Sequence, residues 1–200
     1  MDFKFEYMDT KGRLNTINEL YKLNTTKDIS ISDIIKTYNP SSEEELLAII
    51  TPEKIVELGK QLYNAAIKEN HQTTLQECIN YQYSLFIVNS MKGFLQEKQF
   101  HKLYPNAKQT PSDIDAKYST DFVLDLKNKI ILINIKPESY MRSTNEARIA
   151  VREINRKKMN KFKSKLEFKY PDKSVYTINI IYNYYKEWLN LENLDYLIDK

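Results

Sequence analysis

Residues 121–136 read DFVLDLKNKIILINIK, and this stretch decides the fold. Two short runs rich in β-branched and aromatic residues, 121–126 and 129–135, are separated by Lys127 and Asn128. Such a pair of runs predicts a β-hairpin, although its turn lacks the glycine of the strongest two-residue turns. Pro137 has no backbone N–H to donate, and we expect it to end the second strand.

The chain after the hairpin changes period twice. From about residue 143 to 169 the apolar residues recur at helical spacing. Residues 174–181, SVYTINII, predict a third strand, and a closing helix is expected from about 184 to 199. A hairpin followed by a helix and another strand predicts an α/β fold, in which a small mixed sheet is flanked by helices.

The chain before the hairpin is predicted to be mainly helical. Apolar spacing or a start signal indicates helices near Leu14, Ile31, Glu43, Pro52 and Thr74. Ser41 or Ser42 is expected to cap the third of these, and proline stands at the first position of the fourth. The last should run to about residue 99, with a connection over 100–120. We therefore expect a single domain, residues 1–200, with a mainly helical part over 1–100 and the sheet within 101–200.

The composition narrows the classes of function. Thirty Lys and Arg face 27 Asp and Glu, a net charge of +3, so any affinity for nucleic acid depends on how the charge is distributed. One cysteine and two histidines leave no Cys/His zinc site, and the lone Cys78 fits a reducing compartment. No stretch approaches the roughly 20 apolar residues that span a bilayer. We expect a soluble cytoplasmic protein with no membrane partner.

The predicted hairpin gathers polar side chains at one end of the sheet. Asp121 begins the first strand, and Asn134 and Lys136 follow 13 and 15 positions later, near the end of the second. Residues two apart on a strand share a face, and antiparallel pairing returns them to Asp121. A carboxylate, an amide oxygen and a lysine at one point suit phosphodiester hydrolysis with Mg²⁺, because the metal prefers oxygen ligands and a lysine stabilises developing negative charge.

At these residues the sequence resembles a family. Asp121 with Asn134-Ile135-Lys136 resembles a variant of the PD-(D/E)XK nuclease motif, which also lies on a β-hairpin. The longer pattern, SDID at 112–115 and INIKPESY at 133–140, resembles the MjaI-type type II restriction endonucleases. The resemblance covers about residues 112 to 140. It implies a restriction-endonuclease-like fold and a homodimer that cuts double-stranded DNA with Mg²⁺ at a short specific sequence.

The same resemblance assigns roles to the site residues. It implies that Asp121 binds the metal, that Asn134 contributes a ligand oxygen, and that Lys136 stabilises the transition state or orients water. Asn134 departs from the pattern, since the family usually has an acid there, and an acid from a neighbouring helix can replace it. Glu77 and Glu153 are favoured for that role; further candidates are Glu138, Glu146, Asp113 and Asp115.

The most basic stretch follows the hairpin. Arg148, Arg152 and Arg156 recur every fourth residue and predict a positive stripe on a helix, which would neutralise phosphates or would simply be a solvated face. The residues expected to bind DNA are Arg142, Arg148, Arg152, Arg156 and Lys157. Two other functions stay open: a nucleic-acid-binding protein on a catalytically decayed nuclease fold, and a helical protein-interaction module with a purely structural hairpin.

Overall fold

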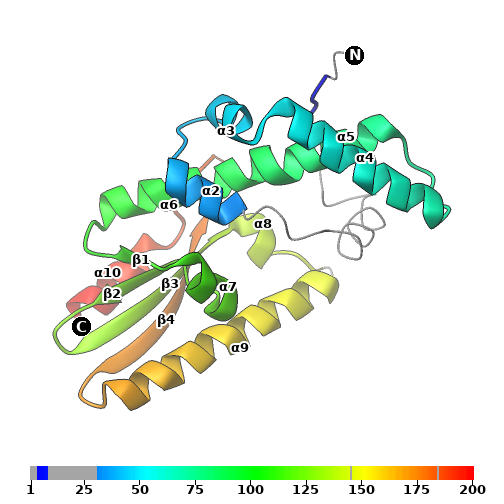
Figure 1. The fold of residues 1–200 in the computed structure, drawn as a ribbon. Helices are drawn as coiled ribbons and strands as arrows, with labels where there is room; N and C mark the ends of the chain where they lie inside the picture. Colours follow the sequence, from blue (N-terminus) through cyan, green and yellow to red (C-terminus); the bar gives the residue numbers. More distant parts are fainter. Residues whose placement is uncertain (1–3, 9–30, 145, 184) are drawn as a thin grey trace. The chain divides into compact units, whose positions relative to one another are not determined.

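The computed structural model describes residues 4–8, 31–144, 146–183 and 185–200 (Figure 1). The helix expected at Leu14 lies outside these residues. The chain divides into two compact units, Met1–Leu95 and Gln96–Lys200. The fold is of the mixed α/β class: the described part of the first unit is helical, and the second contains the sheet. Within the described residues, no helix is both long enough and apolar enough to cross a membrane.

The first unit contains α2 (Ile31–Tyr38), α3 (Glu43–Ile50), α4 (Pro52–Lys68) and α5 (Leu75–Tyr83). The expected helix starts are confirmed. The Ser42 hydroxyl caps α3 by accepting from the Glu45 backbone N–H, and Pro52 begins α4. Ile55, Ile79 and Ile87 are among the fully buried residues of its core. This unit is a conventional helical core, since its apolar side chains lie on the inward faces of short capped helices.

The single helix expected over residues 74–99 is three consecutive segments. After α5 comes a π-helical stretch, η1 (Ser84–Asn89), and then α6 (Ser90–Leu103). The expected continuous helical run is confirmed, but its π turn was not predicted, because apolar spacing does not distinguish an α turn from a π turn. The boundary between the two units falls within α6, between Leu95 and Gln96.

The second unit is built on a four-stranded mixed sheet in the order β1-β2-β3-β4. β1 (Lys108–Gln109) and β3 (Lys129–Pro137) are both antiparallel to β2 (Phe122–Asp125), and β4 (Ser174–Tyr182) is parallel to β3. The hairpin and the third strand are thus confirmed. The connection expected over residues 100–120 instead holds the end of α6, β1 and the short helix α7 (Ser112–Tyr118).

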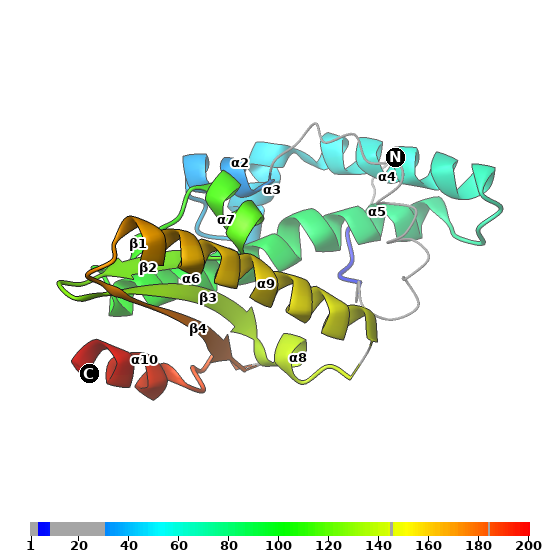
Figure 2. The same cartoon turned by 90° about the horizontal axis from the view of Figure 1, so that it is seen from below.

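The alternating side chains of β3 build two separate cores. Ile131, Ile133 and Ile135 pack with Phe100 of α6 and with Leu194 of α10 (Leu191–Asp199). On the opposite face, the side chains that pack together are Ile130, Leu132, Val175 and, from α9 (Glu146–Lys169), Met159. Figure 2 shows α9 and α10 on opposite sides of the sheet. The central strand is therefore apolar on both faces, as expected for a strand covered twice.

The two C-terminal helices begin later than expected. α9 begins at Glu146 rather than near residue 143, after the short helix α8 (Glu138–Met141). α10 begins at Leu191 rather than near residue 184. The physical reason is pairing along the edge of β4: Leu189 donates to the Ile181 carbonyl at 2.8 Å, and the Asn190 side chain accepts from the Ile181 N–H at 2.8 Å. This pairing keeps the residues directly before Leu191 out of the helix.

Candidate active site

Asp121 is built into the start of the hairpin. Its backbone N–H donates to the Ile133 carbonyl at 2.9 Å, just before β2 begins. Its carboxylate oxygen Oδ2 accepts from the Ile135 backbone N–H at 2.5 Å, in the place where a longer strand would offer a carbonyl. The residue is only 6% exposed. Its other oxygen, Oδ1, makes no hydrogen bond to any described residue, so it is available to a ligand.

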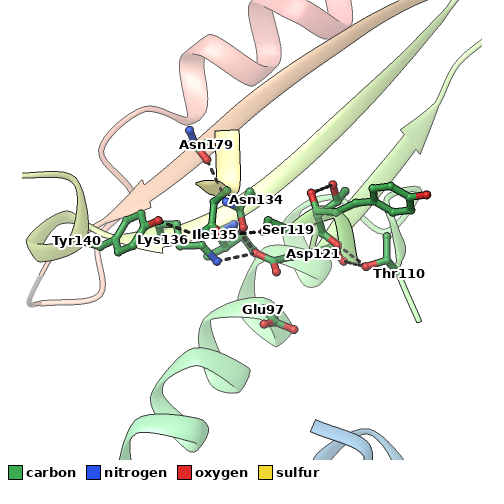
Figure 3. A network of polar contacts seen from close by, with 12 residues as sticks. Glu97, Thr110, Ser119, Asp121, Asn134, Ile135, Lys136, Tyr140 and Asn179 are labelled. Carbon is green, nitrogen blue, oxygen red and sulfur yellow. Dashed lines mark hydrogen bonds and ion pairs between the residues drawn. The ribbon is translucent and has the colours of Figure 1, made fainter. Parts of the chain in front are cut away.

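Lys136 meets this carboxylate from the end of β3. Its Nζ lies 3.6 Å from Asp121 Oδ2, and its side chain is 24% exposed. Among the residues that the structure describes, Asp121 is its one polar side-chain partner. Figure 3 shows the amino group turned toward the carboxylate. The expected meeting of Asp121 and Lys136 is therefore present in the structure.

Asn134 has a different environment from its two expected partners. It is 2% exposed, and its Nδ2 donates to Asn179 Oδ1 at 3.1 Å across the parallel pair β3 and β4 (Figure 3). Its Oδ1 is buried with no hydrogen-bond partner among the described residues. It also lines a cavity against α8 and α9 that neither Asp121 nor Lys136 lines. The structure brings the aspartate and the lysine together and directs the amide to β4.

Glu97 of α6 is an acid near Asp121 that sequence reasoning missed. Its Oε2 accepts from Gln109 Nε2 of β1 at 2.8 Å. Figure 3 shows its side chain on α6, below Asp121 in that view. Both acids affect the pKa of the Tyr182 phenol. Burial raises this pKa, and the negative charges of Glu97 and then Asp121 raise it further. No local signal in the sequence could have found it, because its place depends on how α6 packs on the sheet through Phe100.

The acids favoured from the sequence have other partners. Glu77 completes the capping box of α5, where its Oε2 accepts from the Thr74 N–H at 2.7 Å, and it belongs to the first unit. Glu153 forms an ion pair of 2.6 Å with Arg156 of the same helix, and the Arg156 guanidinium lowers the pKa of the Glu153 carboxyl. Glu153 shares the cavity lined by Asn134. Neither of them forms a hydrogen bond or an ion pair with Asp121.

The other acid candidates are spread over short helices. Glu138 begins α8 and pairs with Arg142 at 2.7 Å, and Glu146 begins α9, where it is exposed. Asp113 and Asp115 lie in the first turn of α7. Acids at these positions suit the positive end of a helix, which accounts for them without a metal.

The basic stripe on α9 is largely engaged with the protein itself. Arg152 donates from Nη1 to three backbone carbonyls, those of Tyr140, Met141 and Ser143, at 2.8 to 2.9 Å. Arg148 reaches the Ser139 carbonyl at 3.4 Å, and Arg156 is paired with Glu153. Arg152 therefore organises the connection from α8 to α9. Arg142 and Arg156 are exposed but are paired with Glu138 and Glu153, so of the residues expected to bind DNA, Lys157 keeps the most available charge for a phosphate backbone.

The side chains at the end of the hairpin can be compared with the ligands that a magnesium ion requires. No group of three or more His, Cys, Asp and Glu suited to a metal occurs within the described residues. Asp121 and Glu97 offer two carboxylates, and Asp121 Oδ1 makes no bond to the described protein. Magnesium keeps several waters and usually takes one or two protein carboxylates, with substrate phosphates completing its shell. Two carboxylates match that requirement in number.

A scan against protein-family models and searches of the curated proteins and the solved structures found no match to this chain.

Proposed function

We propose that this protein is a magnesium-dependent endodeoxyribonuclease. The observation that supports it best is the pairing of Asp121 and Lys136 at the end of a β-hairpin, with their oxygen and nitrogen 3.6 Å apart. A carboxylate, a lysine and a second carboxylate from Glu97 suit phosphodiester hydrolysis. The resemblance at residues 112–140 supports the same chemistry, since its motif places an aspartate and a lysine on such a hairpin.

Each residue has a defined part in this proposal. Asp121 and Glu97 would hold the magnesium ion through their carboxylates. When bound, the ion polarises a phosphoryl oxygen and acidifies a water. Lys136 donates from its amino group to the developing negative charge of the phosphate, or orients the attacking water. Its orientation is prepared in advance, since the Asp121 carboxylate holds the amino group before any substrate arrives.

The finer form of the proposal is a type II restriction endonuclease on a restriction-endonuclease-like fold. The resemblance supports it, together with the order of hairpin, helix and parallel strand in the second unit. Such an enzyme would act on double-stranded DNA at a short specific sequence and would work as a homodimer that cuts both strands. Exposed Arg142, Arg156 and Lys157 would contact phosphates in this arrangement.

The first experiment is incubation of the full chain with supercoiled plasmid DNA and Mg²⁺. Wild type should give discrete fragments, and both chelation of the metal and Lys136→Met should abolish them. Lys127→Met is the matched control, because Lys127 is an exposed lysine of the same hairpin. Cleavage that survives chelation, or that Lys136→Met leaves unchanged, would contradict the proposal.

One observation favours a second function. The position where the resembled motif usually has an acid holds Asn134, whose Nδ2 is bonded to Asn179 rather than aimed at Asp121. A chain that has lost metal affinity at this position would bind nucleic acid without cutting it. In the same experiment, DNA that is retarded in a gel but stays intact would support this binding function. DNA that is neither retarded nor cut would support a protein-interaction module.

A further inference from the structure

A cavity of about 240 Å³ lies between α8, α9 and the face of the sheet that carries Asn134. Its wall combines polar amides with apolar side chains: Asn134, Asn155 and Asn179 stand beside Met141 and Met159. This volume is below the roughly 300–1,000 Å³ of pockets for drug-sized ligands. It therefore suits a small planar molecule, such as one heterocyclic ring system.

The wall contains a hydrogen-bond acceptor without a donor. Asn134 is 2% exposed, its Nδ2 is used by Asn179 Oδ1 at 3.1 Å, and its own Oδ1 is unpartnered among the described residues. A buried carbonyl oxygen in this state is costly, so native proteins rarely keep one without a reason. Asn179 Oδ1 is a second carbonyl oxygen in the same wall. The unpartnered Asn134 Oδ1 selects a ligand group with an N–H donor, above all an amino group.

The opposite wall is held in place by a chain of hydrogen bonds. Ser119 Oγ donates to Asn155 Oδ1 at 3.0 Å, and Asn155 Nδ2 donates to the Tyr140 hydroxyl at 2.8 Å. Arg152 binds the Tyr140 and Met141 carbonyls at 2.8 Å from the other side. The Tyr140 ring is thus an aromatic wall fixed by bonds at both its hydroxyl and its backbone. An aromatic face of this kind stacks on any planar base.

We propose that this cavity binds a nucleobase with an exocyclic amino group, adenine, cytosine or guanine, through Asn134 Oδ1. The proposal deepens the proposed function and rests on it for the nucleotide chemistry, because Asn134 is two residues from Lys136 on β3. A nucleotide with its phosphate at Lys136 would have its base on the adjoining strand positions. The base is either that of a free nucleotide or one unstacked from a DNA strand.

Entry to the acceptor requires a small rearrangement. Asn134 Oδ1 has less than 1 Å² accessible to water, so the base displaces wall atoms to reach it. Met141 and Met159 lie in that wall, and unbranched thioether side chains reposition readily. The amide oxygen itself is shielded from water, and a hydrogen bond formed in such surroundings is stronger than one in water.

The test is a binding measurement with metal chelated, so that it does not depend on cleavage. Full-length protein is titrated by calorimetry with deoxyadenosine monophosphate and with purine deoxyriboside monophosphate, which lacks only the amino group. Deoxyadenosine monophosphate should bind about tenfold more tightly, because the compound that lacks the amino group leaves the acceptor Asn134 Oδ1 unpaired. Equal affinity for the two compounds overturns the proposal. So does a protein that binds neither the monophosphates nor a DNA strand.

Variants and a second set of ligands complete the experiment. Asn134→Leu should erase the tenfold preference, because it removes the acceptor. It also leaves Asn179 Oδ1 without its donor, so circular dichroism first checks that the variant is folded. Asn106→Leu, on the exposed surface, should keep the preference. Single-stranded 12-mers of dA, dC and dT are then compared with the monophosphate. If the dA and dC strands bind far more tightly than the monophosphate, and dT binds more weakly, DNA is the source of the base. If no 12-mer binds better than the monophosphate, the ligand is a free nucleotide. A preference that survives in Asn134→Leu overturns the assignment.

Discussion

Lys136 Nζ lies 3.6 Å from Asp121 Oδ2, and this same oxygen accepts the backbone N–H of Ile135 at 2.5 Å. One carboxylate therefore closes the end of the hairpin and holds the lysine that follows it. The arrangement makes the site part of the sheet rather than an addition to a loop. A catalytic group positioned in this way keeps its orientation without the substrate.

Removal of the Asp121 carboxylate should destabilise the second unit. Asp121→Ala leaves the Ile135 N–H unpaired and separates Lys136 from its partner, so we expect a loss of about 2–4 kcal/mol. Urea unfolding, monitored by the fluorescence of Trp188, measures this loss of stability. Trp188 is the single tryptophan and packs against the core of the second unit. Asp172→Ala is the control, since that aspartate is exposed, and it should stay within about 0.5 kcal/mol. Equal unfolding midpoints for the two variants would show that the Asp121 bonds contribute nothing.

The buried Lys129 should matter far more than its exposed neighbour. Its Nζ donates to the Leu197 and Ile198 carbonyls at 3.0 Å each, at the C-terminal end of α10, and the residue is 7% exposed. A lysine there satisfies carbonyls that a helix end leaves unpaired. Lys129→Met should cost about 2 kcal/mol of unfolding free energy. Lys127→Met in the same hairpin should cost less than about 0.5 kcal/mol, and a larger loss there would contradict this account.

Alkaline pH should weaken the second unit through Tyr104. Burial raises the pKa of this phenol above its ordinary value of 10.0, and its hydrogen bond to Asp195 Oδ1 at 2.7 Å raises it further. The folded state therefore keeps the proton longer than the unfolded chain. This stabilisation is complete below pH 10 and is lost as the pH rises above it. Melting temperatures between pH 8 and 11 should fall less steeply in Tyr104→Phe than in wild type. Tyr196→Phe, at an exposed tyrosine, should follow wild type.

The two described glycines should respond in opposite ways to an added methyl group. A Cβ at Gly59 of α4 would lie 2.5 Å from Ile79 Cγ1 and 2.8 Å from Ile79 Cα of α5, whereas a Cβ at Gly93 meets nothing within 4 Å. Gly59→Ala should destabilise the first unit by roughly 1–3 kcal/mol. Gly93→Ala should add about 0.5–1 kcal/mol through a stiffer unfolded chain. Circular dichroism in urea measures both, and a tolerant Gly59→Ala would mean that α4 and α5 are not packed this closely.

Local signals predicted much of the second unit. The alternation of β3 and the break at Lys127 and Asn128 indicated the hairpin, because they depend on neighbouring residues alone. The start of α10 could not be predicted, since the Leu189 and Asn190 bonds to Ile181 are contacts between segments. β1 has two residues and no apolar alternation, so no period could reveal it. Helical spacing similarly concealed the π turn at Ser84–Asn89.

The residues of the candidate site likewise divide into those that local sequence signals predict and those whose place depends on contacts between segments. Asp121 and Lys136 could be paired from the sequence because the hairpin register relates them directly. Glu97 could not, because its place beside Asp121 depends on how α6 packs on the sheet through Phe100. Asn134 was grouped with Lys136 by the two-residue period of a strand, but period does not show which neighbour an amide will bond. Its bond to Asn179 comes from the parallel pairing with β4.

The most direct test of the central claim is the rate of plasmid cleavage in Mg²⁺ by wild type, Glu97→Gln, Lys136→Met and Glu138→Gln. The account predicts that the glutamine at 97 and the methionine at 136 each slow cleavage by about 10² to 10⁴-fold, since each removes a charge from the reacting phosphate's surroundings. Glu138→Gln, which loses only an ion pair with Arg142, should cut within about threefold of wild type. A wild-type protein that does not cut, or a Glu97→Gln variant that cuts at the wild-type rate, would contradict the claim.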